Sequence, residues 1–234
     1  MADLADRIAE NVAQIRERMV EAAARSGRTA DAVTLVAVTK YVDADTTQAL
    51  VEAGCFALGE SRPQQLWEKA AALTDPRIRW HMIGHLQRNK VRRTLPVAAL
   101  IHSVDTPRLA ASIEEEAAAQ RLPPIPILLE VNTSGESAKH GFEPDMIEPF
   151  LAEAVRYRNI AVRGLMCMAG LEGGPDEARR DFAVLRKLRD RLRCNCPPEI
   201  SLDALSMGMS GDFEIAIEEG ATIVRVGSAL FEGI

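Results

Sequence analysis

The sequence lacks three features that would decide where the protein works. No apolar run approaches the roughly 20 residues that a membrane-spanning helix requires. Residues 1–20 hold no unbroken apolar stretch, so we expect no signal peptide. The formal net charge is −6, so we expect no overall positive field that would attract nucleic acid or an anionic membrane.

Cysteine is also scarce, and its spacing argues against a metal site. The four cysteines are Cys55, Cys167, Cys194 and Cys196. Cys194 and Cys196 are separated by one residue rather than the two of a typical zinc knuckle, and no second cysteine pair completes a site. We therefore expect reduced thiols, no bound metal and a cytoplasmic location.

The chain does contain enough apolar residues for a large core, since 47% of its 234 residues are hydrophobic. From Leu4 to Met19, apolar residues recur at helical spacing. This spacing predicts an amphipathic helix within residues 1–27 that ends near Gly27 and packs on the domain that follows.

After this helix, short apolar runs alternate with longer helical patterns. Apolar strands linked by helices indicate a parallel sheet covered by helices, and eight such units close a barrel. We therefore expect an α/β fold: a single (β/α)8 TIM-type barrel domain over residues 1–234 with one extra N-terminal helix. An open doubly wound sheet is the alternative, but its glycine-rich dinucleotide motif is missing after the first strand. The expected strands are 33–39, 55–60, 78–84, 99–104, 125–132, 161–168, 200–207 and 222–227.

Lys40 follows the first expected strand directly. A lysine in this place is either the polar residue that ends a strand or a nucleophile at the floor of a pocket. In a barrel, catalytic and binding groups come from the C-terminal ends of the strands. Those ends also carry Ser61, His85 and Arg225, so several polar side chains would meet Lys40 at one mouth.

Two loops rich in glycine and serine follow the last two expected strands, at 206–220 and 225–233. Exposed N–H groups in such loops bind anions, and barrels often bind phosphate with the loops after strands seven and eight. Each loop taken alone is equally compatible with a tight turn in which Ser210 or Asp212 caps a helix. The two loops together favour phosphate binding.

A phosphate-binding end and a lysine on the first strand predict pyridoxal 5'-phosphate as the ligand, with Lys40 forming the Schiff base. Arg225 would then donate to the pyridine nitrogen. Because a guanidinium does not readily give up its proton, that nitrogen would stay unprotonated, and the ring would be a weak electron sink. In the alternative, Arg225 forms a salt bridge with Glu60 or Asp203 inside the barrel.

Several segments resemble a known family. "LVAVTKYV", "RWHMIGHLQRNKVR", "EVNTSGESAKHGF", "VRGLMCM" and "LSMGMSGDFEIAIEEGATIVRVGSALF" are similar, in order, to motifs of the pyridoxal phosphate homeostasis proteins. These are single-domain relatives of the alanine racemase N-terminal barrel, a fold-type III barrel. The resemblance spans nearly the whole chain. It implies a barrel that binds pyridoxal phosphate without established turnover and serves vitamin B6 and amino-acid homeostasis.

The resemblance also implies roles for individual residues. Lys40 would be the Schiff-base lysine, and Arg225 would meet the ring nitrogen. Ser61 stands where the family usually has asparagine, so it keeps a hydroxyl but loses an amide, and any ring contact there is altered. The positions that would hold the phosphate are Ser206, Met207, Gly227 and Ser228.

Other polar residues near the expected mouth have two interpretations. His85 is expected to open the helix after the third strand, where it acts as an acid or base beside the cofactor or hydrogen-bonds to a neighbouring loop. His81 fits a satisfied barrel histidine, and the basic run 88–93 fits a solvated helix face. Residues 132–139 either ring the mouth or form an Asx-type turn. The methionines expected to wall the pocket or pack in the core are Met166, Met168, Met207 and Met209.

Three functions compete. A cofactor-binding protein without substantial catalysis is favoured, because a racemase needs two bases and alanine racemases take one, a tyrosine, from an added C-terminal domain. Tyr41 and Tyr157 do not replace it, and the sequence ends soon after Ser228. The alternative is a single-domain racemase that uses Lys40 and His85. An aldolase-type barrel is disfavoured, because such enzymes commonly carry their lysine on a later strand.

The expected partners follow from the cofactor. Pyridoxal phosphate is the expected small-molecule partner, and pyridoxal-phosphate-dependent apoenzymes are candidate recipients of it. We expect no nucleic acid and no membrane as partner. A closed barrel buries its own core, so we expect a monomer.

Overall fold

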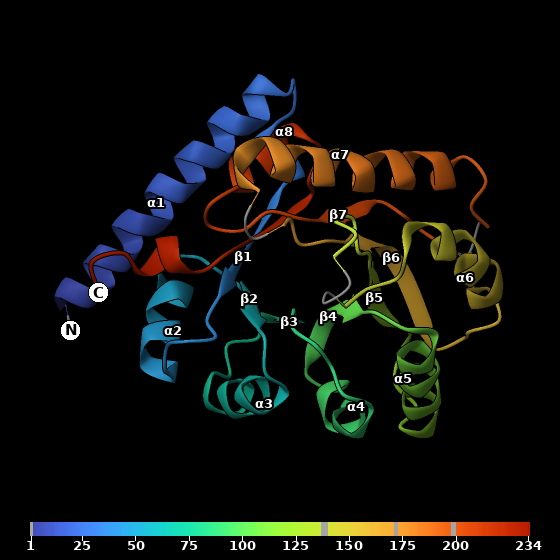
Figure 1. Ribbon diagram of the computed structural model, residues 1–234. Coiled ribbons are helices and arrows are strands. Elements are labelled where there is room, and N and C mark those ends of the chain that lie inside the picture. The colour runs from blue at the N-terminus through green and yellow to red at the C-terminus, as the bar shows by residue number, and fades with distance from the viewer. Residues whose placement is uncertain (1, 137–139, 171–172, 198–199) are drawn as a thin grey trace.

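The computed structural model describes residues 2–136, 140–170, 173–197 and 200–234. In this part of the chain, eight strands close into a barrel, and each pairs in parallel with its neighbours (Figure 1). The expected (β/α)8 barrel is confirmed, and the first strand closes it by pairing with the eighth. The strands are β1 (Thr34–Val38), β2 (Ala57–Glu60), β3 (Arg79–Met82), β4 (Ala98–Val104), β5 (Ile125–Glu130), β6 (Ile160–Met166), β7 (Ala204–Ser206) and β8 (Ile223–Val226).

Helices surround this barrel (Figure 1). An α-helix follows each of the first seven strands, and proline or a polar N-cap begins several of them, such as the Asp43 carboxylate that accepts from the N–H of Thr46. The α-helices are α1 (Ala2–Arg25), α2 (Ala44–Glu52), α3 (Pro63–Ala72), α4 (Arg88–Thr94), α5 (Pro107–Ala119), α6 (Ile147–Ala154), α7 (Gly174–Arg193) and α8 (Phe213–Glu218).

The eighth unit differs from the expected β-then-α pattern. After β8 comes only a short 3-10 helix, η3 (Ser228–Phe231). Two similar turns, η1 (Ala30–Ala32) and η2 (Pro144–Met146), precede β1 and α6. The extra helix α1 packs against α2, α8 and η3, and so closes the ring of helices where an eighth would have been. Among the described residues, no helix combines the length and apolar character needed to cross a bilayer.

Helix α1 is held on the barrel by an apolar face and by polar contacts, of which that of Asn11 is buried. Ile8 and Val12 are completely or almost completely buried. Asn11 between them is also buried, and its Nδ2 donates to the carbonyl oxygens of Leu230 at 3.2 Å and Glu232 at 3.1 Å. This places the two ends of the chain side by side in Figure 1.

Side-chain direction alternates along each strand, and this decides what faces the barrel interior. Lys40 and Arg225 stand four and two residues after the interior positions Val36 and Ile223, so both point inward at the C-terminal ends of their strands. The neighbouring positions of opposite parity pack against the helices in the larger core. The interior apolar cluster consists of Val36, Leu128, Met166 and Ile223.

Candidate functional site

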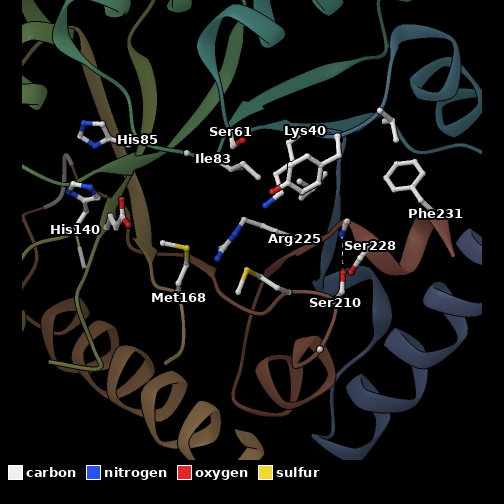
Figure 2. Close-up of a pocket in the computed structure, with 18 residues that line it drawn as sticks. Lys40, Ser61, Ile83, His85, His140, Met168, Ser210, Arg225, Ser228 and Phe231 are labelled. Carbon is white, nitrogen blue, oxygen red and sulfur yellow. Dashed lines mark hydrogen bonds between the residues drawn. The ribbon is translucent and has the colours of Figure 1, made fainter. Parts of the chain in front are cut away.

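A cavity of about 660 Å³ opens at the C-terminal ends of the strands. Its volume is within the range of small-molecule sites, and side chains from several strand ends line it. We call its two ends the serine end and the histidine end. Figure 2 shows them in order: Ser210 and Ser228 at the serine end, Lys40 and Arg225 in the middle, and His85 and His140 at the histidine end.

Lys40 lines the middle of the cavity and is half-buried. Its Nζ lies 4.8 Å from the centroid of the Tyr41 ring, which is itself 86% exposed. The lysine that follows the first expected strand therefore places its amine in the wall of the cavity.

A buried polar network fixes the backbone just before Lys40. Thr39 points away from the cavity, and its Oγ1 donates to Glu60 Oε1 at 2.6 Å. The ammonium of Lys69, from α3, donates to the Thr39 carbonyl at 2.6 Å and to Glu60 Oε1 at 2.5 Å. Because Thr39 is tied to β2 and α3, the next residue enters the cavity from a fixed position.

Arg225 forms the floor of the cavity and is almost completely buried. Its Nη1 donates to Ser206 Oγ at 2.6 Å, and its Nη2 donates to the carbonyl oxygen of Cys167 at 3.0 Å. Burial lowers the pKa of this guanidinium, while the nearby Cys167, Glu130 and Asp212 raise it. Guanidinium is nevertheless protonated in proteins, so the floor carries a positive charge.

The alternative salt bridge of Arg225 does not form. Glu60 faces outward and pairs with Lys69 at 2.5 Å. Asp203 is exposed and pairs with Arg193 at 2.7 Å. The alternative of an ion pair with either carboxylate is therefore wrong, because both point away from the barrel interior.

Ser206 and Met207 lie beneath and beside the cavity rather than on its wall. Ser206 is fully buried, and its Oγ contacts both Arg225 and His102 Nδ1, the latter at 2.9 Å. Met207 has the opposite strand parity, so its side chain is buried in the outer core, and its N–H donates to the carbonyl of Ile223. The structure thus separates these two from Gly227 and Ser228, which do line the cavity.

The serine end is built from the two glycine- and serine-rich loops. Ser210 Oγ accepts from the N–H groups of Gly227 at 3.1 Å and Ala229 at 3.5 Å, so two backbone donors point at one oxygen. Asp212 is the N-cap of α8 but makes no capping bond there; its Oδ1 instead accepts from the N–H of Met209 at 2.6 Å. From the sequence, Ser210 is expected only as a helix cap, whereas here it accepts from two N–H groups of the next loop.

Two neutral histidines support the floor from below. His81 Nδ1 and His102 Nε2 are 2.8 Å apart and share a hydrogen bond. Burial lowers the pKa of His81 to about 4 and that of His102 well below its ordinary value. The interpretation of His81 as a satisfied barrel histidine is confirmed, and the hydrogen bonds continue through His102 and Ser206 to Arg225.

Glu130 lines the cavity and was missed by sequence reasoning. It is only 5% exposed, at the C-terminal end of β5. Burial and, to a lesser extent, the nearby Asp105 raise the pKa of its carboxyl to about 7, although Arg225 acts in the opposite direction. A carboxyl with this pKa holds a proton in part of the population at neutral pH. The signal was present, since an acidic residue ends an otherwise apolar run.

His85 lies in the loop before α4, not at the start of that helix as expected, because α4 begins only at Arg88. Its Nδ1 is 3.0 Å from Asp105 Oδ2, and its ring stacks on that of His140 with centroids 4.6 Å apart. His85 therefore makes the expected contact with a neighbouring loop and lines the cavity as well.

Some of the remaining candidate residues line the cavity, and the others only support the structure around it. Ser61 lines the cavity, whereas Asn132 forms the Asx-type turn, with Oδ1 accepting from the N–H of Gly135 at 3.1 Å. Lys139 at the end of that loop lies outside the described residues. The basic run in α4 is mostly exposed, as expected for a solvated face. Of the four methionines expected to wall the pocket or pack in the core, Met168 and Met209 line the cavity, and Met166 and Met207 are buried.

Comparison with known proteins places the chain among barrels of one family. Residues 5–233 match the family model of the alanine racemase N-terminal domain. The pyridoxal phosphate homeostasis protein of Aquifex aeolicus is 38% identical over 222 residues, which are 95% of this chain and 96% of the relative. The protein of the same name from Pseudomonas aeruginosa is 41% identical over 225 residues, 96% of this chain and 94% of the relative.

Solved structures of similar proteins have the same fold. PipY of Synechococcus elongatus with pyridoxal phosphate bound is 32% identical, with a TM-score of 0.84, covering 96% of this chain and 99% of that one. A protein from Bifidobacterium adolescentis is 36% identical with a TM-score of 0.92, covering 99% of this chain and 97% of that one. An alanine racemase from Clostridium difficile is 13% identical with a TM-score of 0.76, and this chain covers 56% of it. At that identity the likeness shows the fold alone.

Proposed function

The chain belongs to the alanine racemase N-terminal domain family and, within it, to the pyridoxal phosphate homeostasis proteins, and we propose that it binds pyridoxal 5'-phosphate as a Schiff base with Lys40. One observation carries this proposal: an amine, a buried guanidinium and a loop with convergent N–H groups line one cavity. These are the three groups that an aldehyde, a pyridine nitrogen and a phosphate require.

The donors of the cavity fit the cofactor from end to end. At the serine end, the N–H groups of Gly227 and Ala229 converge on one hydroxyl oxygen, as they would on a phosphate oxygen. A Cβ built on Gly211 would meet nothing within 4 Å, so this side of the loop is open to a ligand. Arg225, held by Ser206 and the Cys167 carbonyl, supplies a donor that stays protonated for the ring nitrogen.

These residues favour binding of the cofactor rather than catalysis with it. Bound pyridoxal phosphate supplies an electron sink, but a guanidinium opposite the ring nitrogen keeps that nitrogen unprotonated and the sink weak. We therefore propose that this single barrel domain serves intracellular vitamin B6 and amino-acid homeostasis without substantial turnover. Pyridoxal-phosphate-dependent apoenzymes are the proposed recipients of the cofactor, and the protein would act as a monomer.

The proposal predicts a visible absorbance band that depends on Lys40. Purified protein incubated with pyridoxal phosphate should show the band of a protonated Schiff base, and Lys40→Ala should lose it. Lys187→Ala is the matched control, because Lys187 is exposed on α7 away from the cavity and its loss should leave the band unchanged.

Two outcomes would contradict the proposal. If wild type and Lys40→Ala give the same spectrum at saturating cofactor, the Schiff base is on another amine or absent. If the purified protein racemises an amino acid at an enzyme-like rate, the single-domain racemase is supported instead. In that case Lys40 and either His85 or Glu130, which all line the cavity, would be the two bases to test.

A further inference from the structure

The histidine end of the cavity gathers three groups that the proposed cofactor site does not require. Asp105 directly follows β4, His85 lies between β3 and α4, and His140 precedes the segment that leads to η2. One possible ligand atom from each lies within 4.8 Å of the other two. Three loops thus bring two imidazoles and a carboxylate to one point.

Both imidazoles lie near the same carboxylate oxygen, Oδ2 of Asp105. His85 Nδ1 lies 3.0 Å from Asp105 Oδ2, a hydrogen-bond distance. His140 Nδ1 lies 3.8 Å from the same oxygen, which is too far for a hydrogen bond. The rings stack at an interplanar angle of 22°. A hydrogen bond to Asp105 therefore explains the position of His85 but not that of His140.

We propose that Asp105, His85 and His140 bind a divalent transition-metal ion, and zinc best fits their chemistry. Two imidazoles and one carboxylate, with a fourth position open, form a recurrent zinc site. In a tetrahedral site with bonds of about 2.1 Å, neighbouring ligand atoms are about 3.4 Å apart. The two measured distances to Asp105 Oδ2, 3.0 and 3.8 Å, lie on either side of that value.

The surroundings of the Asp105 carboxylate favour a bound cation. Asp105 is only 6% exposed, and its other oxygen, Oδ1, accepts a hydrogen bond from Thr106 Oγ1 at 3.3 Å. Such a contact outside the ligand shell fixes the orientation of a metal-binding carboxylate. Within the described part of the chain, no lysine or arginine forms an ion pair with Asp105. Of the described residues, only the two imidazoles pair with Asp105, and a metal ion would stabilise its buried charge.

Two of the three proposed ligands, His85 and His140, reach the cavity, and Glu130 lines it beside them. The charge of Asp105 disfavours ionisation of Glu130, so a metal ion here would neutralise negative charge that the two carboxyl groups share. The ion would thus present a site for a water or a ligand oxygen at the end of the cavity opposite Ser210 and Ser228. The ligands are all side chains of this chain, so the inference does not depend on the proposed cofactor.

The test is a titration with zinc chloride in competition with a colorimetric zinc indicator. Cys194 and Cys196 are free thiols near the surface, so the protein carries Cys194→Ser and Cys196→Ser to remove their own zinc binding. We expect one zinc ion per chain and a loss of affinity of about tenfold or more in His140→Gln and in Asp105→Asn. His140→Gln is the decisive variant, because its side chain is 64% exposed and the substitution leaves the core intact.

Asp145→Asn is the matched control, since it removes an exposed carboxylate of η2 and should leave zinc affinity unchanged. Equal affinity in wild type and His140→Gln would overturn the proposal. The titration is repeated with and without pyridoxal phosphate. Zinc bound only when the cofactor is present, and insensitive to His140→Gln, would place the metal on the cofactor and equally overturn it.

Discussion

At the scale of single residues, Glu130 is the least expected group in the cavity. Burial raises the pKa of its carboxyl to about 7, from an ordinary value of 4.5. Between these two values the folded state holds the proton that the unfolded state releases. Stability from this group is therefore fully present below about pH 4.5 and is lost as the pH rises through 7, by up to about 3 kcal/mol.

Glu130→Gln should remove this dependence on pH. The free energy of unfolding of the variant, measured in urea, should rise relative to wild type by up to about 3 kcal/mol between pH 5 and pH 8. His81 and His102 act with the opposite sign, because their lowered pKa values cost stability below about pH 6.5, but they are common to both proteins and cancel.

Glu148→Gln serves as a control for the charge change, since Glu148 is exposed on α6. Its profile should run parallel to that of wild type. The metal-binding residues are kept empty with a chelator, because Asp105 influences Glu130. A Glu130→Gln profile that is also parallel to wild type would show that the carboxyl is ionised throughout.

Single residues also show where sequence reasoning reached its limit. Lys40, Arg225 and Gly227 reach the cavity because strand parity sends them inward, and parity can be read from an apolar run. His140 could not be placed beside His85 in the same way. Their contact depends on the path of a long loop after β5, which no local pattern encodes.

At the scale of elements, β1, β2 and α3 are joined by the buried pair of Lys69 and Glu60. Both groups are almost inaccessible, and Lys69 also donates to the Thr39 carbonyl. Glu60 Oε2 has no hydrogen-bond partner among the described residues, so the pair depends on the single contact at Oε1. Removing one partner of a buried pair leaves an uncompensated charge.

Lys69→Met should therefore destabilise the barrel by about 3–5 kcal/mol and weaken cofactor binding, because it releases the backbone beside Lys40. Urea unfolding and the absorbance titration measure the two effects. The double variant Lys69→Met with Glu60→Gln removes both charges and should recover much of the stability but not the hold on Thr39. Recovery of full affinity in the double variant would show that the network does not position Lys40.

The element pattern was largely predictable, with one instructive exception. All eight strands were expected from apolar runs bounded by helical patterns, because a strand buried on both faces leaves a continuous signal. The role of α1 as the member that closes the ring of helices between α8 and α2 was not expected. The apolar stripe of α1 indicates that the helix packs against another surface, but it does not indicate which elements form that surface.

At the scale of the whole molecule, the barrel is closed, and the cavity draws residues from strand ends on opposite sides of it. Lys40 follows β1, Met168 follows β6, and Glu130 ends β5. A ligand in this cavity therefore contacts distant parts of the chain at once. Its binding energy should stabilise the fold as one unit rather than a single loop.

A ligand that binds only the folded state at 100 times its dissociation constant stabilises it by about 2.7 kcal/mol. For a chain of this length, that should raise the midpoint of thermal unfolding by about 5–11 °C, measured by circular dichroism with pyridoxal phosphate. Lys40→Ala should show a clearly smaller rise, because only the phosphate and ring contacts remain, and Lys187→Ala should match wild type. A rise of the same size in Lys40→Ala would mean that the serine end and Arg225 hold the ligand without the lysine, and the Schiff base would then add little to the stability of the whole barrel.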